Sequence, residues 1–298
     1  MASPAFPAFP PALPSLVAKT YAKALAAGDL TFTASARTSD ISLRNVTYRL
    51  RFCPSLLHKP QNLTPDPTKP KLNPFLPPRP GLLVASTPGY NIVLNRFPII
   101  AQHFLLCTAE FQVQTEPLRP EDVAAVYAVL REWEVPGERL YGFFNSGAMS
   151  GASQPHRHVQ FFPIGNERGR LPFDEAPARG GEVWIHPHMP FRCFCIRFSE
   201  KPGVQEVVGA YQTLLKKCWE LLGEGCDYNM GIMREWIVML PRVSDDGGRP
   251  GVGINGTVLA GEIMVKKQED WDFFVDGGLE SVLRGIGVPN DGSAEGKD

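Results

Sequence analysis

The residues best suited to chemistry lie in one stretch, 144–163, which reads FNSGAMSGASQPHRHVQFFP. Within it His156, His158 and Gln160 are spaced by two, and on a β-strand such residues project from the same face, about 7 Å apart. Two imidazoles and a carboxamide in a row are costly to bury unless their donors and acceptors are satisfied. The spacing therefore indicates a functional row on a strand.

Small residues precede this row and favour a phosphate site. Ser146, Gly147 and the run 150–153 (SGAS) form a loop whose backbone N–H groups could converge on phosphate oxygens. Phosphoryl transfer through a histidine nucleophile requires such a loop beside aligned imidazoles. In that chemistry one ring nitrogen attacks phosphorus, while the other is held by a carbonyl that fixes the tautomer.

Other interpretations of the histidines are open. An HxH pair on a strand can supply two zinc ligands, but zinc normally takes three or four, and His58 and His103 follow no recognised zinc spacing. The pair could also lie on an edge strand without function, and the loop could be an ordinary wide turn. A second HxH pair, His186 and His188 in IHPHMP (185–190), lacks both the small-residue loop and the following glutamine. We interpret that second pair as structural.

Composition limits the class of protein. A chain of 298 residues with 43% hydrophobic and 20% charged side chains can bury a sizeable core. Its formal net charge of −1 gives no bulk field for nucleic acid or an anionic membrane. No apolar run reaches the roughly 18–20 residues of a bilayer span, and the first fifteen residues lack the pattern of a signal peptide. We expect a cytoplasmic protein, with the nucleus as a second location.

The six cysteines at 53, 107, 193, 195, 218 and 226 include no CxxC pair. This spacing argues against a zinc ribbon and a disulfide framework, so we expect reduced, mostly buried thiols and no protein-held metal.

The elements that must position the row alternate irregularly. Apolar periodicity predicts helices over 15–27, from Pro120 and over 204–222, and strands over 46–53, 90–95, 103–108, 141–145, 156–162, 191–198, 228–233 and 236–241. Many strands, few helices and no βαβ rhythm favour an α+β fold with a mostly antiparallel sheet flanked by helices.

Proline marks the segments outside these elements. Five of the first fourteen residues are proline, which predicts a flexible arm over 1–14, and a second proline-rich run predicts a loop at about 54–80. Residues 287–298 have the composition of a disordered tail. The rest, 15–286, is predicted to be a single catalytic domain.

The stretch 145–160, NSGAMSGASQPHRHVQ, closely resembles the active-site segment of fungal diadenosine tetraphosphate (Ap4A) phosphorylases, also called ATP adenylyltransferases. That family belongs to the histidine-triad superfamily, in the branch of galactose-1-phosphate uridylyltransferase, where a glutamine such as Gln160 replaces the third histidine. The resemblance covers most of the chain through five further blocks: PSLLHKP (54–60), IVLNRFPII (92–100), HFLLCTAEF (103–111), EWIVMLPR (235–242) and INGTVLAGEIMVK (254–266). It implies a histidine-triad-like fold.

The resemblance also implies catalytic roles. His158 would be the nucleophile that becomes adenylylated, Gln160 would hold the transferred α-phosphate, and His156 belongs with them. The loop of Gly151, Ala152, Ser153 and Gln154 would cradle the phosphates, and Asn145 would contact the phosphate chain. Asn95 and Arg96 would contact the nucleoside or its ribose, and Lys59 and Lys266 would supply cations for the polyphosphate. A further nucleotide-contacting strand would contain Asn255, Gly256 and Thr257.

Two positions depart from the family pattern. Glu262 stands where the family commonly has methionine, and a carboxylate repels polyphosphate unless it faces away or binds a cation. Pro155 replaces an acidic residue before the first histidine, which stiffens the loop and leaves the histidine spacing intact.

The glutamine itself restricts the reaction. A carboxamide does not titrate near neutral pH, so Gln160 favours leaving groups that depart unprotonated, such as ATP from a dinucleoside polyphosphate. The phosphoramidate bond retains much of the anhydride energy, which makes transfer to phosphate reversible. We therefore expect Ap4A and phosphate to give ATP and ADP through adenylylated His158. No cofactor is expected to be tightly bound, while Mg²⁺ or Mn²⁺ would accompany the polyphosphate.

Three alternatives stay open at this point. A hexose-1-phosphate uridylyltransferase would use the same nucleophile, but its usual HPH motif is HRH here, and the metal ligands of that family have no convincing counterparts. A dinucleotide hydrolase and a non-catalytic nucleotide sensor could share the same pocket.

Overall fold

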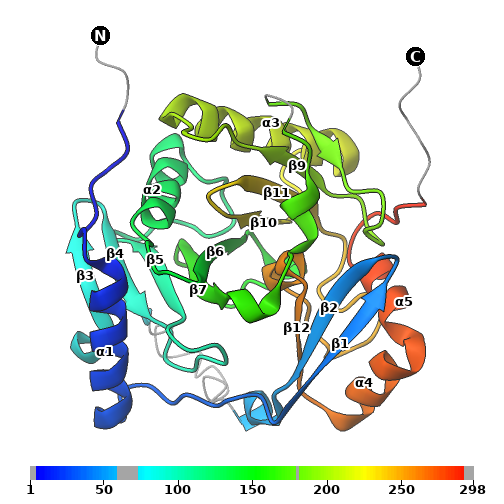
Figure 1. Ribbon diagram of the computed structural model, residues 1–298, viewed down its shortest axis with the longest axis horizontal. Helices are drawn as coiled ribbons and strands as arrows, with labels where there is room; N and C mark the ends of the chain where they lie inside the picture. Colours follow the sequence, from blue (N-terminus) through cyan, green and yellow to red (C-terminus); the bar gives the residue numbers. More distant parts are fainter. Residues whose placement is uncertain (1–4, 59–72, 179–180, 292–298) are drawn as a thin grey trace, which may run out of the picture.

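A nine-stranded sheet forms the centre of the protein (Figure 1). The structure, a computed structural model, describes residues 5–58, 73–178 and 181–291. The strand order is β3-β4-β5-β7-β6-β10-β11-β9-β8, and every neighbouring pair is antiparallel. The strands are β3 Leu83–Thr87, β4 Tyr90–Leu94, β5 Phe104–Thr108, β6 Glu138–Asn145, β7 His158–Gly165, β8 Trp184–Ile185, β9 Phe194–Arg197, β10 Tyr228–Ile232 and β11 Trp236–Pro241. The predicted α+β class is confirmed.

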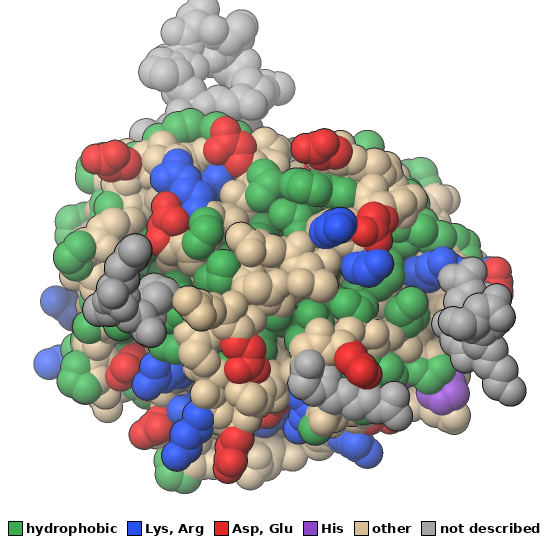
Figure 2. Space-filling view, turned by 90° about the horizontal axis from the view of Figure 1, so that it is seen from above, with side chains coloured by type: hydrophobic (Ala, Val, Ile, Leu, Met, Phe, Trp, Pro, Cys, Tyr) green, Lys and Arg blue, Asp and Glu red, His purple; other side chains and the backbone are tan. Residues whose placement is uncertain are grey.

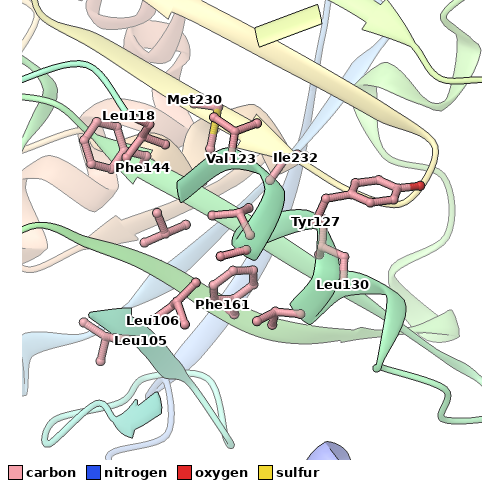
Figure 3. Packing of buried hydrophobic residues seen from close by; sticks show 14 of the residues in the cluster. Leu105, Leu106, Leu118, Val123, Tyr127, Leu130, Phe144, Phe161, Met230 and Ile232 are labelled. Atoms are coloured by element: carbon pink, nitrogen blue, oxygen red, sulfur yellow. The ribbon is translucent and has the colours of Figure 1, made fainter. Parts of the chain in front are cut away.

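Three helices cover one face of this sheet (Figure 1). They are α1 Leu13–Ala27, α2 Pro120–Arg131 and α3 Val204–Leu222. Figure 3 shows how Val123, Tyr127 and Leu130 of α2 lie over Phe161 of β7. The helix begins with proline at its first turn, where a missing N–H costs nothing.

A second, smaller sheet covers the opposite face. It has the order β1-β2-β12, made of β1 Arg37–Leu43, β2 Val46–Phe52 and β12 Glu262–Val265, and β12 runs parallel to β2. Tyr48 and Leu50 of β2 belong to a buried apolar cluster that includes Phe143 and Phe162 of the large sheet. The helices α4 Gln268–Phe273 and α5 Leu279–Gly285 follow β12.

The predicted elements have close counterparts, with shifts at the ends. The helix over 204–222 and the strand over 236–241 have the predicted bounds. The strand predicted over 156–162 begins later, because β7 starts at His158 and His156 forms only an isolated bridge with Val113.

The described parts of the expected arm and tail are packed, which corrects both predictions there. Phe9 is buried, and the ring of Phe6 lies 5.3 Å from that of Tyr127. At the other end, the Asn290 side chain is buried and its Nδ2 donates to the Met189 carbonyl oxygen at 3.0 Å. The packing is due to apolar and amide side chains, such as Phe9 and Asn290, that lie between the prolines and glycines. A prediction from overall composition does not take these individual side chains into account.

Acidic and basic side chains are interspersed on the face shown in Figure 2. This distribution agrees with the near-zero net charge. Among the described helices, none has both the length and the apolarity needed to span a bilayer.

Candidate active site

His158 lies at the start of β7 and is only 4% exposed. Its Nδ1 is 2.8 Å from the backbone oxygen of His156. A carbonyl can only accept, so Nδ1 carries the proton and the lone pair lies on Nε2. This geometry confirms the expectation that a carbonyl fixes the tautomer of one histidine.

Burial also sets the charge of this ring. Loss of solvent lowers the pKa of His158 to about 4, although the bond to the His156 carbonyl acts in the opposite direction. The imidazole is therefore neutral around pH 7, and its Nε2 lone pair is available to an electrophile.

His156 is buried and both of its ring nitrogens are engaged. Nε2 lies 2.9 Å from the Thr108 carbonyl oxygen, which requires a proton on Nε2, and Nδ1 lies 2.8 Å from Asn73 Nδ2. Burial lowers the pKa of His156 as well. Both nitrogens of the ring are thus engaged in internal hydrogen bonds, and the backbone oxygen of His156 contacts the His158 ring.

The described end of the proline-rich segment covers the two histidines. The ring centroid of Phe75 is 5.1 Å from that of His158 and 5.7 Å from that of His156. Asn73 accepts the backbone N–H of Phe75 with Oδ1 at 3.0 Å, which orients its Nδ2 toward His156. The sequence analysis assigned no role to Asn73 or Phe75, since no local pattern predicts a contact with residues so far along the chain.

Gln114 joins two strands where their own pairing stops. β6 and β7 pair up to Phe143 and Gln160. Beyond that point, the Oε1 of Gln114 accepts the backbone N–H of His158 at 2.8 Å, and its Nε2 donates to the Asn145 carbonyl at 2.7 Å. The side chain is 1% exposed. It joins the His158 end of β7 to β6, and no sequence signal marked it.

Arg157 anchors the opposite side of the HRH tripeptide. Its side chain is 2% exposed and donates through Nη1 to Asp122 Oδ2 at 2.9 Å, in the first turn of α2. The backbone between the two histidines is therefore tied to a helix terminus.

Gln160 contacts a histidine that sequence reasoning left without a role. His103 Nε2 lies 3.1 Å from Gln160 Oε1, and His103 Nδ1 lies 3.2 Å from Asn95 Nδ2. Asn95 Oδ1 accepts the backbone N–H of Phe97 at 3.0 Å. Both ends of the Asn95 amide thus make internal hydrogen bonds, and its expected contact with the nucleoside stays a prediction. The neighbouring Arg96 is exposed, with its guanidinium 5.1 Å from the Phe97 ring centroid.

The structure brings the predicted phosphate loop against residues 255–257. These residues begin a 3-10 helix, Gly256–Ala260, so the strand expected there is wrong. Asn145 Oδ1 accepts the backbone N–H of Gly256 at 2.9 Å and the Asn229 amide at 2.8 Å. Gly151 has φ +80°, and a Cβ there would come within 3.0 Å of Asn255 Cβ. Only glycine suits that backbone and that close approach.

Other predicted contacts differ in how available they are. Ser153 is exposed, whereas Ala152, Gln154 and Lys266 are half-buried. Thr257 donates its hydroxyl to the Glu262 carbonyl at 2.8 Å and is buried, so the hydroxyl serves the fold. Lys59 lies outside the described residues.

Glu262 is neutralised by two arginines. It is 2% exposed and accepts from Arg51 Nε at 2.6 Å and Arg168 Nε at 2.7 Å. A cavity of about 350 Å³ at the far end of β7 is lined by these three side chains, Phe162 and Ile100, among others.

The second HxH pair has a structural geometry. His186 is 1% exposed, its Nε2 lies 3.0 Å from the Pro172 carbonyl oxygen, and its Nδ1 accepts the backbone N–H of His188 at 3.1 Å. Across 5–58, 73–178 and 181–291, no group of three or more His, Cys, Asp or Glu side chains could hold a metal ion.

Two family models together match almost all of the described chain. The Ap4A phosphorylase N-terminal domain matches residues 5–178, and the ATP adenylyltransferase C-terminal domain matches residues 187–289. The chain belongs to the Ap4A phosphorylase family.

Yeast relatives of the Ap4A phosphorylase family match over most of their length. Protein APA1 of Saccharomyces cerevisiae is 28% identical over 308 residues, which cover 94% of this chain and 96% of the relative. Diadenosine 5',5'''-P1,P4-tetraphosphate phosphorylase 2 of the same yeast is 28% identical over 253 residues, covering 74% and 77%. The crystal structure of yeast Ap4A phosphorylase Apa2 in complex with AMP has a TM-score of 0.81 at 25% identity, and covers 94% of this chain and 98% of Apa2. The Apa2 complex with Ap4A has a TM-score of 0.79.

Proposed function

We propose that this protein catalyses the reversible phosphorolysis of Ap4A, in which Ap4A and phosphate give ATP and ADP through an adenylyl group on His158 Nε2. The observation that carries the mechanism is the bond from Nδ1 to the His156 carbonyl, which leaves the lone pair on Nε2. Membership of the Ap4A phosphorylase family and the likeness to Apa2, solved with Ap4A and with AMP, support the substrate.

The first half-reaction transfers the adenylyl group to the enzyme. The Nε2 lone pair forms a bond to the α-phosphorus, and the bond from that phosphorus to the bridging oxygen breaks. ATP leaves with the electron pair. Because Nδ1 keeps its proton, the adenylylated ring carries a positive charge, which the His156 carbonyl stabilises through the same 2.8 Å hydrogen bond.

The second half-reaction discharges the enzyme. An oxygen of inorganic phosphate attacks the α-phosphorus, the P–N bond breaks, and its electron pair returns to Nε2. The product is ADP. Water is a poorer acceptor because the carboxamide of Gln160 cannot act as its base, whereas phosphate is already anionic.

The polyphosphate would be held by the loop 151–154, the Asn145 amide, Lys59 and Lys266, together with Mg²⁺ or Mn²⁺ brought by the substrate. The cavity of about 350 Å³ beside Phe162 falls in the general size range of small-molecule pockets and would take the nucleoside. All six cysteines are free thiols, which supports a reducing compartment such as the cytoplasm.

The proposal is tested by omitting phosphate. The enzyme is mixed with excess Ap4A in phosphate-free buffer, and ATP, AMP and the mass of the protein are followed. We expect about one equivalent of ATP per active site, an increase in mass equal to one adenylyl group, and release of ADP when phosphate is added.

The control is His158→Ala, which should give no ATP burst and no adduct while binding Ap4A within about tenfold of the wild-type affinity, since the nucleophile acts mainly in the transition state. Steady release of AMP without phosphate, at a rate near that with phosphate, would instead make the protein a hydrolase. Binding without any burst would make it a nucleotide sensor.

A further inference from the structure

We infer that His103 is a positioning residue that aims the amide nitrogen of Gln160 at the transferred phosphoryl group. The inference rests on the proposed function and assigns to the chain a third active-site histidine, which lies beside the glutamine rather than in its place. The Gln160 carboxamide can point either its oxygen or its nitrogen at the substrate, and His103 selects one of these two orientations.

The orientation follows from a series of hydrogen bonds that begins at a backbone group. The N–H of Phe97 can only donate, so the Asn95 atom 3.0 Å away is the oxygen, and Asn95 Nδ2 faces His103. An amide nitrogen can only donate, so His103 Nδ1 accepts and, in the neutral ring, Nε2 carries the proton. That proton is donated to Gln160 Oε1 at 3.1 Å.

The other end of the Gln160 amide is consequently Nε2, with two N–H donors. Gln160 is half-buried, and its Nε2 makes no hydrogen bond to the described residues. Gln160 lies two residues beyond His158 on the same face of β7. Donors at that position attract the charge that develops on the phosphoryl oxygens, whereas a flipped amide would present its oxygen and repel them.

The ring of His103 is held by packing as well. Its centroid lies 6.1 Å from that of Phe143 and 6.0 Å from that of Phe162. The backbone N–H of Asn95 donates to the His103 carbonyl at 2.9 Å, which continues the pairing of β4 with β5. His103 therefore has little freedom to turn, and the relay from Asn95 to Gln160 keeps one geometry.

The test uses His103→Phe, which keeps an aromatic ring between Phe143 and Phe162 and removes both nitrogens. We expect kcat for Ap4A phosphorolysis to fall about 10- to 100-fold, the range known for loss of the hydrogen-bond partner that orients a metal ligand. KM for Ap4A should stay within about threefold. His188→Phe, at an exposed histidine, is the matched control and should retain wild-type kcat.

A double variant separates positioning from a merely structural effect. If His103 acts through Gln160, adding His103→Phe to Gln160→Leu should lower kcat by no more than about twofold beyond Gln160→Leu alone. Multiplying effects would overturn the inference, as would a His103→Phe kcat within about threefold of wild type.

A spectroscopic measurement covers the case in which His103→Phe fails to fold. Nitrogen-15 NMR of the wild-type protein should place the His103 proton on Nε2, and a proton on Nδ1 would contradict the inference. The proposed function is judged separately, because wild-type turnover and an inactive His158→Ala would stand whatever His103 does.

Discussion

The His158 side chain gives the clearest prediction for pH. Its pKa of about 4 lies below the ordinary histidine value of 6.5 because burial disfavours the charged ring. The rate of ATP release in a single turnover without phosphate should therefore stay flat from pH 8 down to about pH 5. Phosphate-free conditions keep the ionisation of the acceptor out of the measurement. A rate that halves near pH 6.5 would show that the nucleophile is not this buried ring.

The same shift affects stability, and its sign is fixed. Between about pH 6.5 and 4 the unfolded chain binds a proton at His158 that the folded chain does not. The contribution of this residue to the free energy of unfolding consequently falls as the pH drops through that window, and is constant above it.

Residues that act locally could be predicted from the sequence, whereas those brought in by the fold could not. The tautomer of His158 is fixed by the backbone carbonyl of His156, two residues earlier, so it could be predicted from the HxH motif alone. Asn73 and Gln114 reach the two histidines from other segments, and His103 reaches Gln160. No spacing in the sequence relates these three residues to residues 156–160. The hydrogen bond between Asn95 and His103 could not be predicted for the same reason.

Among the elements, the junction of β6 and β7 depends on one side chain. Gln114→Ala should lower the free energy of unfolding by about 1–3 kcal/mol, because the His158 N–H and the Asn145 carbonyl lose their buried partner. It should also lower kcat, since His158 is no longer held in register. Urea unfolding together with phosphorolysis rates measures both.

The matched control for this prediction is Gln112→Ala. The Gln112 side chain accepts from Arg119 at the exposed surface, so its loss should change stability by less than about 0.5 kcal/mol. If both variants behave alike, the link between β6 and β7 does not depend on Gln114.

The elements that the sequence did predict are those with strong apolar periodicity. All six residues of β11 are buried, and α3 buries a stripe of apolar residues at helical spacing. The ends of both elements were predicted correctly. β1 is a half-exposed edge strand with polar residues, and β12 has four residues, so neither carries a recognisable pattern. The helical segment after β12 is interrupted at Gly277, which has φ +99°.

Over the whole molecule, the two segments recognised by the family models share one sheet. β6, from the first segment, pairs with β10, from the second, and β7, which begins at His158, lies next to β6. The large sheet is therefore continuous across the boundary between the models.

The C-terminal residues 287–291 close this arrangement and can be tested by truncation. A chain that ends at Ile286 lacks the hydrogen bonds of Asn290, whereas a chain that ends at Asp291 keeps them. The free energy of unfolding of the shorter chain should therefore be lower by about 2–4 kcal/mol. Asn290 donates to the His186 and Met189 carbonyls, and the Arg192 N–H donates to the Val288 carbonyl at 2.7 Å. Equal melting temperatures of the two chains would mean that these bonds contribute nothing net.

The parallel pairing of β2 with β12 has a consequence for synthesis on the ribosome. β2 leaves the ribosome early and β12 near the end, and at about 5–20 residues per second the two are separated by on the order of ten seconds or more. During that interval β2 has only β1 beside it, and a two-stranded hairpin alone is marginal in water. For most of its translation the nascent chain thus carries apolar side chains of β2, such as Tyr48 and Leu50, without the neighbours that bury them in the finished fold.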